Sequence, residues 1–236
     1  MNHQCIARGA ALSRPPGKEK QRKRPQQSLH PAPFAEKAQA PRGWYISPVI
    51  FRLAVWYMKS LGWRFEGERP KDPKFILLGA PHTSNWDFLL TLALMAHFDL
   101  PLRYMVKDSV FKGPWGGFFR SLGAIPIDRS KNYNRVEATI EAFRTQEKMV
   151  LGILPEGTRK RTEFWKSGFY HIAHGAGVPL VLAKVDGPNK TLTLGLRLET
   201  SGDIEADMAK IAAFYEGAQG IYPEKFGPVR LRPGDS

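Results

Sequence analysis

The chain has 236 residues, enough to fill one hydrophobic core, so a single folded domain is expected. Its apolar content of 42% is ordinary for a globular protein and excludes wholesale disorder. The only cysteine, Cys5, excludes both a disulfide framework and a cysteine-based metal site.

The formal net charge of +13 is concentrated at the start of the chain. Residues 1–43 contain nine Lys or Arg and two Asp or Glu, a net +7 that leaves +6 for the rest. This segment is rich in Pro and Gln and lacks apolar periodicity, so we predict a disordered basic leader. Such a charge suits a nucleic acid, an anionic bilayer or a phosphorylated substrate. No base-stacking motif or recognition helix accompanies it, so nucleic acid is not an expected partner.

An apolar and aromatic segment, residues 44–63, follows the leader and is interrupted by Arg52 and Lys59. A helix of about fifteen residues spans roughly 22 Å, less than the ~30 Å hydrocarbon core of a bilayer. Aromatic residues with basic flanks favour an amphipathic helix in the headgroup layer, which predicts a peripheral or monotopic protein on the cytoplasmic face of a membrane. The alternative is an ordinary amphipathic helix packed on the domain.

Short apolar runs and helical patterns alternate through residues 64–236. We expect an α/β fold, a single layered domain with a largely parallel or mixed sheet flanked by helices and preceded by the membrane-contact helix. The stripe of Val136, Ile140 and Phe143 is typical of a helix. The expected strands are Phe75–Gly79, Arg103–Val106, Ala124–Ile127, Met149–Leu154, Val178–Val185 and Thr191–Leu198. The expected helices are Trp86–Phe98, Arg135–Gln146 and Ile204–Glu216.

A histidine and an aspartate follow the first of these strands. Ser84 or Asn85 suits a helix N-cap, which puts Asp87 in the first helical turn, where the helix dipole favours a negative charge. His82 precedes the turn, close enough for Asp87 to accept its ring N–H. This arrangement leaves the other ring nitrogen free to take a proton from a hydroxyl. Taken alone, the pattern is weak, and a structural loop histidine or half of a zinc site would also explain it.

Two further strand ends make the catalytic interpretation stronger. The strand Met149–Leu154 leads into Pro155-Glu156-Gly157-Thr158-Arg159, where Gly157 permits close backbone approach and Arg159 offers a bidentate fork for a phosphate. The strand Ala124–Ile127 ends in Asp128-Arg129 and delivers a second guanidinium. Ligand sites of α/β sheets collect at the carboxyl ends of strands, so we expect these groups to lie near His82.

These motifs together resemble the glycerolipid acyltransferases, a family that includes bacterial 1-acylglycerol-3-phosphate acyltransferase. The resemblance covers about residues 74–185, and its elements occur in the family's order. They are His82 to Asp87, the stretch from Lys107 to Lys112 that leads to Gly123–Arg129, the run Pro155–Arg159, and Val178-Pro179-Leu180. Residues 64–236 are therefore expected to form an acyltransferase domain.

The resemblance implies that His82 is the general base on a lysophospholipid hydroxyl and that Asp87 supports it. It implies that Lys107, Arg129, Glu156, Gly157, Thr158 and Arg159 serve the phosphate end of the acceptor. Pro179 would shape the donor or acyl side. Acyl-CoA or acyl-carrier protein would be the co-substrate, with no resident cofactor or metal, and an anionic membrane surface would be a partner.

Departures from the family pattern leave the acceptor open. Pro81 precedes the histidine, where many members have asparagine, and no second proline follows Pro179. Another lyso-lipid acceptor, a silent lipid-binding protein and a lipid-surface hydrolase are the alternatives. We expect Phe118 and Phe119 to pack in the core rather than to contact lipid. Backbone amides around Thr83–Asn85 are the candidate oxyanion donors.

Overall fold

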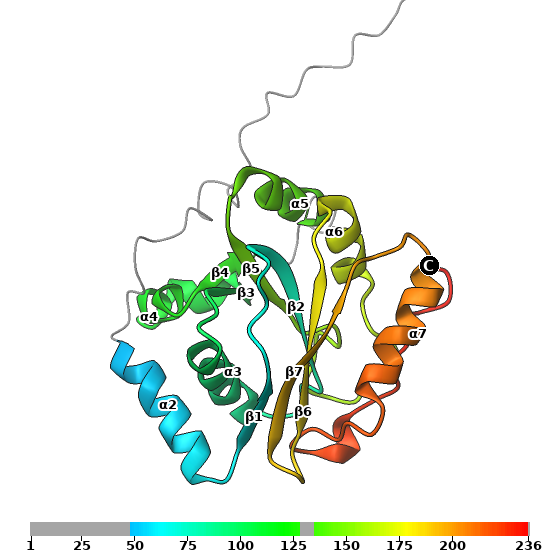
Figure 1. The fold of residues 1–236 in the computed structure, drawn as a ribbon. Helices are drawn as coiled ribbons and strands as arrows, with labels where there is room; N and C mark the ends of the chain where they lie inside the picture. The colour runs from blue at the N-terminus through cyan, green and yellow to red at the C-terminus, as the bar shows by residue number, and fades with distance from the viewer. Residues whose placement is uncertain (1–47, 128–134, 236) are drawn as a thin grey trace, which may run out of the picture. The chain divides into compact units, whose positions relative to one another are not determined.

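The structure is a computed structural model that describes residues 48–127 and 135–235. The predicted leader, Cys5 and Arg129 lie outside these ranges. Within them, one mixed sheet of seven strands is covered by helices on both faces (Figure 1). The strands are β1 (Arg64–Gly67), β2 (Lys74–Ala80), β3 (Leu102–Lys107), β4 (Ala124–Ile127), β5 (Met149–Ile153), β6 (Leu180–Asp186) and β7 (Thr191–Leu198). The helices are α2 (Pro48–Ser60), α3 (Trp86–His97), α4 (Gly116–Ser121), α5 (Arg135–Thr145), α6 (Gly168–Ala176) and α7 (Ile204–Tyr215), with short 3-10 helices η1 (Asp108–Lys112) and η2 (Pro223–Lys225).

The strand order is β1-β7-β6-β2-β5-β3-β4. Strands β6, β2, β5, β3 and β4 run parallel, whereas β7 runs antiparallel to β6 and β1 runs parallel to β7. The predicted α/β class and mixed sheet are thus confirmed. Because β2 and β5 are adjacent and parallel, the loops that follow them emerge side by side at one edge of the sheet.

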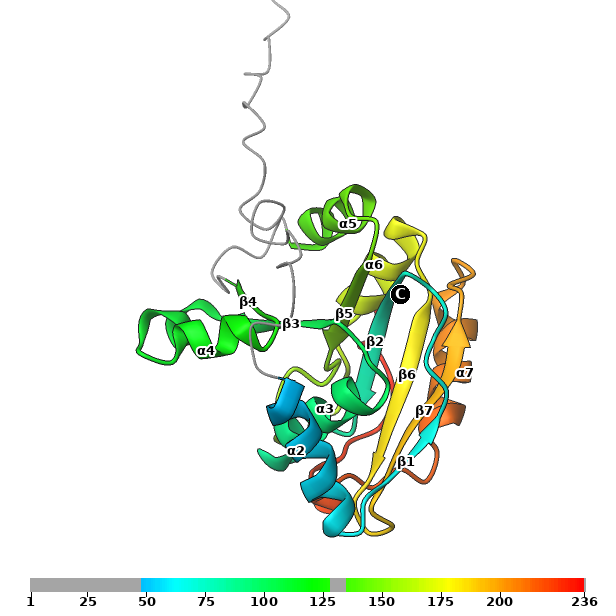
Figure 2. The same ribbon diagram turned by 60° about the vertical axis from the view of Figure 1, so that its left-hand side comes forward.

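Two hydrophobic clusters sandwich the sheet. Successive side chains of a strand point to opposite faces, so Phe75 and Leu77 of β2 pack with α2 and α3, whereas Ile76 and Leu78 pack with α5, α6 and α7. A strand buried on both faces must be apolar at nearly every position, which explains why β2 reads as a continuous apolar run. Figure 2 shows α2 and α3 on one side of the sheet and α7 on the other.

Helix α2 has two apolar faces. Phe51, Ala54 and Met58 recur at helical spacing and are buried in the cluster that includes α3. The opposite face carries exposed apolar side chains, namely Val49, Ile50, Leu53, Trp56 and Tyr57. The helix therefore packs on the domain and still presents an apolar surface. In the described parts of the chain, no helix is both long enough and apolar enough to span a membrane.

The expected strands and helices are present with ends shifted by at most two residues. Residues 44–47 of the predicted interfacial segment lie outside the described ranges. The sequence pattern does not reveal β1, α4 or α6. Two glycines obscured α6, and Gly175 has a packing reason: a Cβ there would lie 2.5 Å from Cδ1 of Ile140 on α5. The glycine lets α5 and α6 approach closely.

Candidate active site

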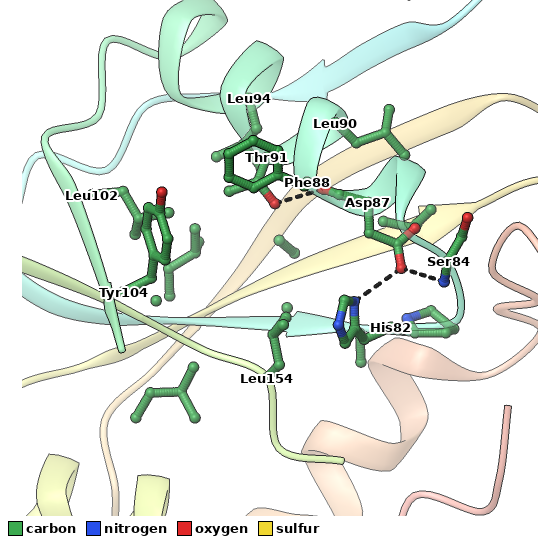
Figure 3. A pocket seen from close by; sticks show the side chains of 18 of the residues that line it. His82, Ser84, Asp87, Phe88, Leu90, Thr91, Leu94, Leu102, Tyr104 and Leu154 are labelled. Atoms are coloured by element: carbon green, nitrogen blue, oxygen red, sulfur yellow. Dashed lines mark hydrogen bonds and ion pairs between the residues drawn. The ribbon is translucent and has the colours of Figure 1, made fainter. Parts of the chain in front are cut away.

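His82 lies just beyond β2, and Asp87 lies in the first turn of α3 (Figure 3). The His82 Nδ1 and Asp87 Oδ2 atoms are 2.9 Å apart. Oδ2 also accepts the backbone N–H groups of Thr83 at 2.8 Å and Ser84 at 2.9 Å. Because this oxygen acts as an acceptor, we assign the ring proton to Nδ1, which leaves Nε2 free to accept one.

The backbone amides of Thr83 and Ser84 are thus directed at Asp87. For these two amides, the structure contradicts our expectation that backbone amides around Thr83–Asn85 would stabilise an oxyanion. The side chain of Ser84 accepts the N–H of Trp86 at 3.1 Å, so Ser84 rather than Asn85 supplies the side-chain hydrogen bond at the start of α3. Within this loop, the Asp87 carboxylate and the Ser84 hydroxyl thus accept the backbone N–H groups of Thr83, Ser84 and Trp86.

The histidine loop is also held from two distant parts of the chain. Glu156, in the loop after β5, accepts the backbone N–H of His82 through Oε2 at 2.7 Å. The Thr83 hydroxyl accepts the N–H groups of Ile221 and Tyr222, each at 3.1 Å. His82 therefore sits on a backbone that is fixed by its neighbouring strand loop and by the carboxyl-terminal segment.

Glu156 is buried, with 5% of its surface exposed. Burial raises the pKa of Glu156 to about 7, and the Asp87 charge acts in the same direction, whereas the His82 N–H and ring oppose the rise. Glu156 lines neither of the two cavities beside His82. The resemblance implied that Glu156 contacts the acceptor, but in the structure its carboxyl group binds the backbone N–H of His82.

An apolar cavity of about 330 Å³ opens on one side of His82. It lies between the sheet and α3, and Figure 3 shows the surrounding side chains. Its walls are mainly aliphatic and aromatic, including Leu90, Leu94, Leu102, Phe88 and Phe119. A space of this character fits a hydrocarbon chain.

A second cavity, of about 660 Å³, lies toward α5 and α6. Arg135, Arg159 and Lys166 contribute cationic groups to its wall. His82 and Arg159 line both cavities, as do Tyr104 and the strip Gly152–Leu154. The cationic cavity has the chemistry to receive a phosphate.

The structure brings three of the seven predicted binding residues to the cationic cavity. Gly157, Thr158 and Arg159 line the cationic cavity, and Gly157 adopts the left-handed φ of 65°. Lys107 ends β3, but its side chain is outside the described part of the molecule. Pro179 precedes β6, where its carbonyl accepts the Ile76 N–H, and lines a different cavity with Asp72 and Arg197. Pro179 is therefore at the opposite edge of the sheet from His82.

Three residues in the cavity walls are not among the site residues predicted from the sequence. The Lys166 side chain packs against the Pro155–Arg159 loop, because a Cβ on Gly157 would lie 2.9 Å from Cε of Lys166. Arg135 begins α5. Tyr104 has a buried hydroxyl with no hydrogen-bond partner among residues 48–127 and 135–235.

A family model matches the chain. The Acyltransferase family model matches residues 63–183, which include His82, Asp87 and the Pro155–Arg159 loop. The chain belongs to this acyltransferase family.

A solved structure with a similar fold is that of the 1-acyl-sn-glycerophosphate (LPA) acyltransferase PlsC from Thermotoga maritima. It is 19% identical, with a TM-score of 0.52 over 75% of this chain and 81% of that chain. At this identity the match shows that the two proteins share a fold. No curated protein matches the chain.

Proposed function

We propose that the protein transfers a fatty acyl group from acyl-CoA or acyl-carrier protein to the free hydroxyl of a lysophospholipid, with 1-acylglycerol-3-phosphate as the principal acceptor. The observation that carries this proposal is the location of His82 where the apolar and the cationic cavity meet. An acyltransfer between these substrates needs a base beside a hydrocarbon site and an anion site. The family match supports the reaction class.

In the proposed reaction, Nε2 of His82 removes the proton from the acceptor hydroxyl as the oxygen attacks the thioester carbonyl. Asp87 holds the ring through Nδ1 and stabilises the imidazolium that forms. The tetrahedral intermediate then expels the thiolate, and the thiolate takes up the proton that His82 holds. The acyl–oxygen bond forms, the acyl–sulfur bond breaks, and no water or redox step is involved.

The two cavities suit the two substrates, with the acceptor phosphate in the cationic cavity and the acyl chain of the donor in the apolar one. Arg159 and Lys166 line the cationic cavity and would bind the phosphate, with Arg135 on the same wall. The apolar cavity would receive an acyl chain beside the reacting centre. The reaction requires no resident cofactor, since base catalysis and substrate orientation lower its barrier.

We also propose that the enzyme works at the cytoplasmic face of an anionic membrane. The apolar outer face of α2 and the net charge of +13 support this location. Both substrates carry long hydrocarbon chains, so the bilayer surface is where they would be found.

Thiol release by the purified full chain tests the reaction. Acyl-CoA or acyl-carrier protein is supplied with and without lysophosphatidic acid, followed by a panel of other lyso-lipids. We expect thiol release that depends on the acceptor and is fastest with lysophosphatidic acid. Release at the same rate without an acceptor would indicate a hydrolase. Folded protein that releases no thiol under any of these conditions would contradict the proposal.

A further inference from the structure

A series of aromatic rings leads from the protein surface to the apolar cavity. The Trp115 and Phe118 ring centroids are 6.3 Å apart, and those of Phe118 and Phe119 are 5.8 Å apart. The ring centroids of Phe119 and Phe88 on α3 are 6.3 Å apart, and those of Phe88 and Tyr104 on β3 are 6.4 Å apart. Phe119, Phe88 and Tyr104 all line the cavity. The series therefore connects the surface at α4 with the interior of the cavity.

The outer end of this series is exposed to solvent. Trp115 is 67% exposed and Phe118 is 42% exposed, which corrects the prediction that Phe118 packs in the core. Adjacent exposed aromatic side chains that are in contact with the lining of an apolar cavity are typical of a surface that meets a partner. Indole rings are favoured at the headgroup level of a membrane, because one part of the ring is apolar and its N–H is polar.

Cations flank the exposed aromatic side chains. The Arg120 guanidinium lies over the Phe111 ring, 5.2 Å from its centroid, and Lys112 is paired with Asp108 at 3.2 Å. Gly116 allows the compact form of this segment, because a Cβ there would lie 2.4 Å from the Phe111 carbonyl oxygen. Aromatic side chains between Lys and Arg complement an anionic lipid surface in both apolar character and charge.

The segment also lies close to α2. Figures 1 and 2 both show α4 near the amino end of α2, on the side of the sheet that α2 and α3 cover. The exposed apolar side chains of α2 and the exposed rings of Trp115 and Phe118 therefore belong to segments that lie near each other in the fold.

We propose that residues 108–121 form a lipid-contacting lip, which inserts Trp115 and Phe118 into an anionic bilayer and passes an acyl chain along Phe118, Phe119 and Phe88 into the cavity. The chain-transfer part rests on the proposed function, whereas lipid insertion does not. A chain that follows this route stays in contact with apolar groups, so its methylenes are not exposed to water between bilayer and active site.

A fluorescent probe tests insertion independently of activity. In a Cys5→Ser background, Trp115→Cys is labelled with an environment-sensitive fluorophore and mixed with phosphatidylglycerol–phosphatidylcholine vesicles. Glu199→Cys, at an exposed position beyond the end of β7, is the control. We expect a blue shift and quenching by lipid-borne quenchers for the probe at 115 and neither for the probe at 199. An aqueous emission at 115 with vesicles present would overturn the proposal.

Kinetics test the path. Trp115→Ser combined with Phe118→Ser is compared with wild type, first on vesicles and then with soluble substrates. At saturating vesicles with long-chain substrates, we expect the double variant to lose about tenfold in kcat. With short-chain, water-soluble substrates, the two proteins should have similar rates.

Two results would contradict the path. One is a double variant that keeps wild-type kcat on vesicles, and the other is an equal loss of kcat with short-chain, water-soluble substrates. A wild-type protein that is inactive even with soluble substrates would contradict the proposed function instead, and the probe at 115 would still report on insertion.

Discussion

Glu156 acts on His82 through the main chain. Its carboxyl oxygen holds the His82 N–H at 2.7 Å, whereas Asp87 holds the ring. His82 is thus fixed at both its backbone and its side chain, and each fixing group is itself buried. We interpret Glu156 as a positioning residue, since it touches neither cavity.

Replacing the proposed base should abolish most of the activity. Positioned proton transfer contributes roughly 10²–10⁴-fold, so His82→Ala should raise the barrier by about 3–5 kcal/mol. Acceptor-dependent thiol release measures this loss, and circular dichroism checks the fold. His174→Ala is the matched control: that ring is exposed on α6 and contacts Thr200 at 3.2 Å. Equal activity of the two variants would exclude His82 as the base.

Glu156 should make stability depend on pH. Its pKa is raised from 4.5 to about 7, so between these values the folded chain keeps a proton that the unfolded chain has released. The free energy of unfolding therefore falls as pH rises through this window, by up to about 3 kcal/mol, and then levels off. Glu156→Gln removes this dependence and should be more stable than wild type at pH 8 but not at pH 4.5.

Urea unfolding at several pH values measures the difference between the two proteins. Glu141→Gln, on the exposed face of α5, is the control and should follow wild type. In the Glu156→Gln variant, the amide oxygen of the new side chain can still accept the His82 N–H. This variant should therefore keep most of its turnover, and Glu156→Ala should not. Parallel stability curves for wild type and Glu156→Gln would show that Glu156 is ionised in the folded protein.

At the scale of the elements, α2 has two faces that should respond differently to substitution. Met58 is 2% exposed and packs toward α3, so Met58→Ala should lower the free energy of unfolding by about 2 kcal/mol. Leu53 is exposed, so Leu53→Ser should leave stability nearly unchanged while weakening binding to anionic vesicles. Urea unfolding and vesicle co-sedimentation separate the two effects. A loss of stability in Leu53→Ser would show that the outer face is packed.

The elements that sequence could predict are those whose burial determines their composition. Strand β2 is buried on both faces and reads as an unbroken apolar run, so it was found. Strand β1 is mostly exposed, and its Arg64 and Glu66 hide the pattern. Helix α6 was missed because Gly175, which accommodates Ile140, interrupts the helical signal. Local pattern thus fails where packing against a distant element selects the residue.

The same distinction applies to the site. The His82–Asp87 contact was predictable because both residues belong to one strand-to-helix connection. The strand order is not encoded locally, so the sequence could not show that the β5 loop turns Glu156 toward the His82 backbone. It also could not show that Pro179, at the amino end of β6, lies away from the site.

For the whole molecule, the charge predicts how membrane binding depends on salt. Raising ionic strength from about 0.1 M to about 1 M shortens the screening length from roughly 10 Å to roughly 3 Å. With a net charge of +13, the chain should lose most of its binding to anionic vesicles over this range and bind phosphatidylcholine vesicles weakly throughout. Co-sedimentation measures both. Binding to anionic vesicles that is unaffected by salt would mean that apolar insertion dominates.

The wall shared by the two cavities has a kinetic consequence. Gly152–Leu154, Tyr104 and Arg159 belong to both cavities, so a ligand in one changes the surface that the other presents. Donor and acceptor should then bind with heterotropic linkage, each altering the affinity of the enzyme for the other by the same factor. Initial-rate plots should intersect, as for a ternary complex. Leu154→Ala should change the Michaelis constants of both substrates together.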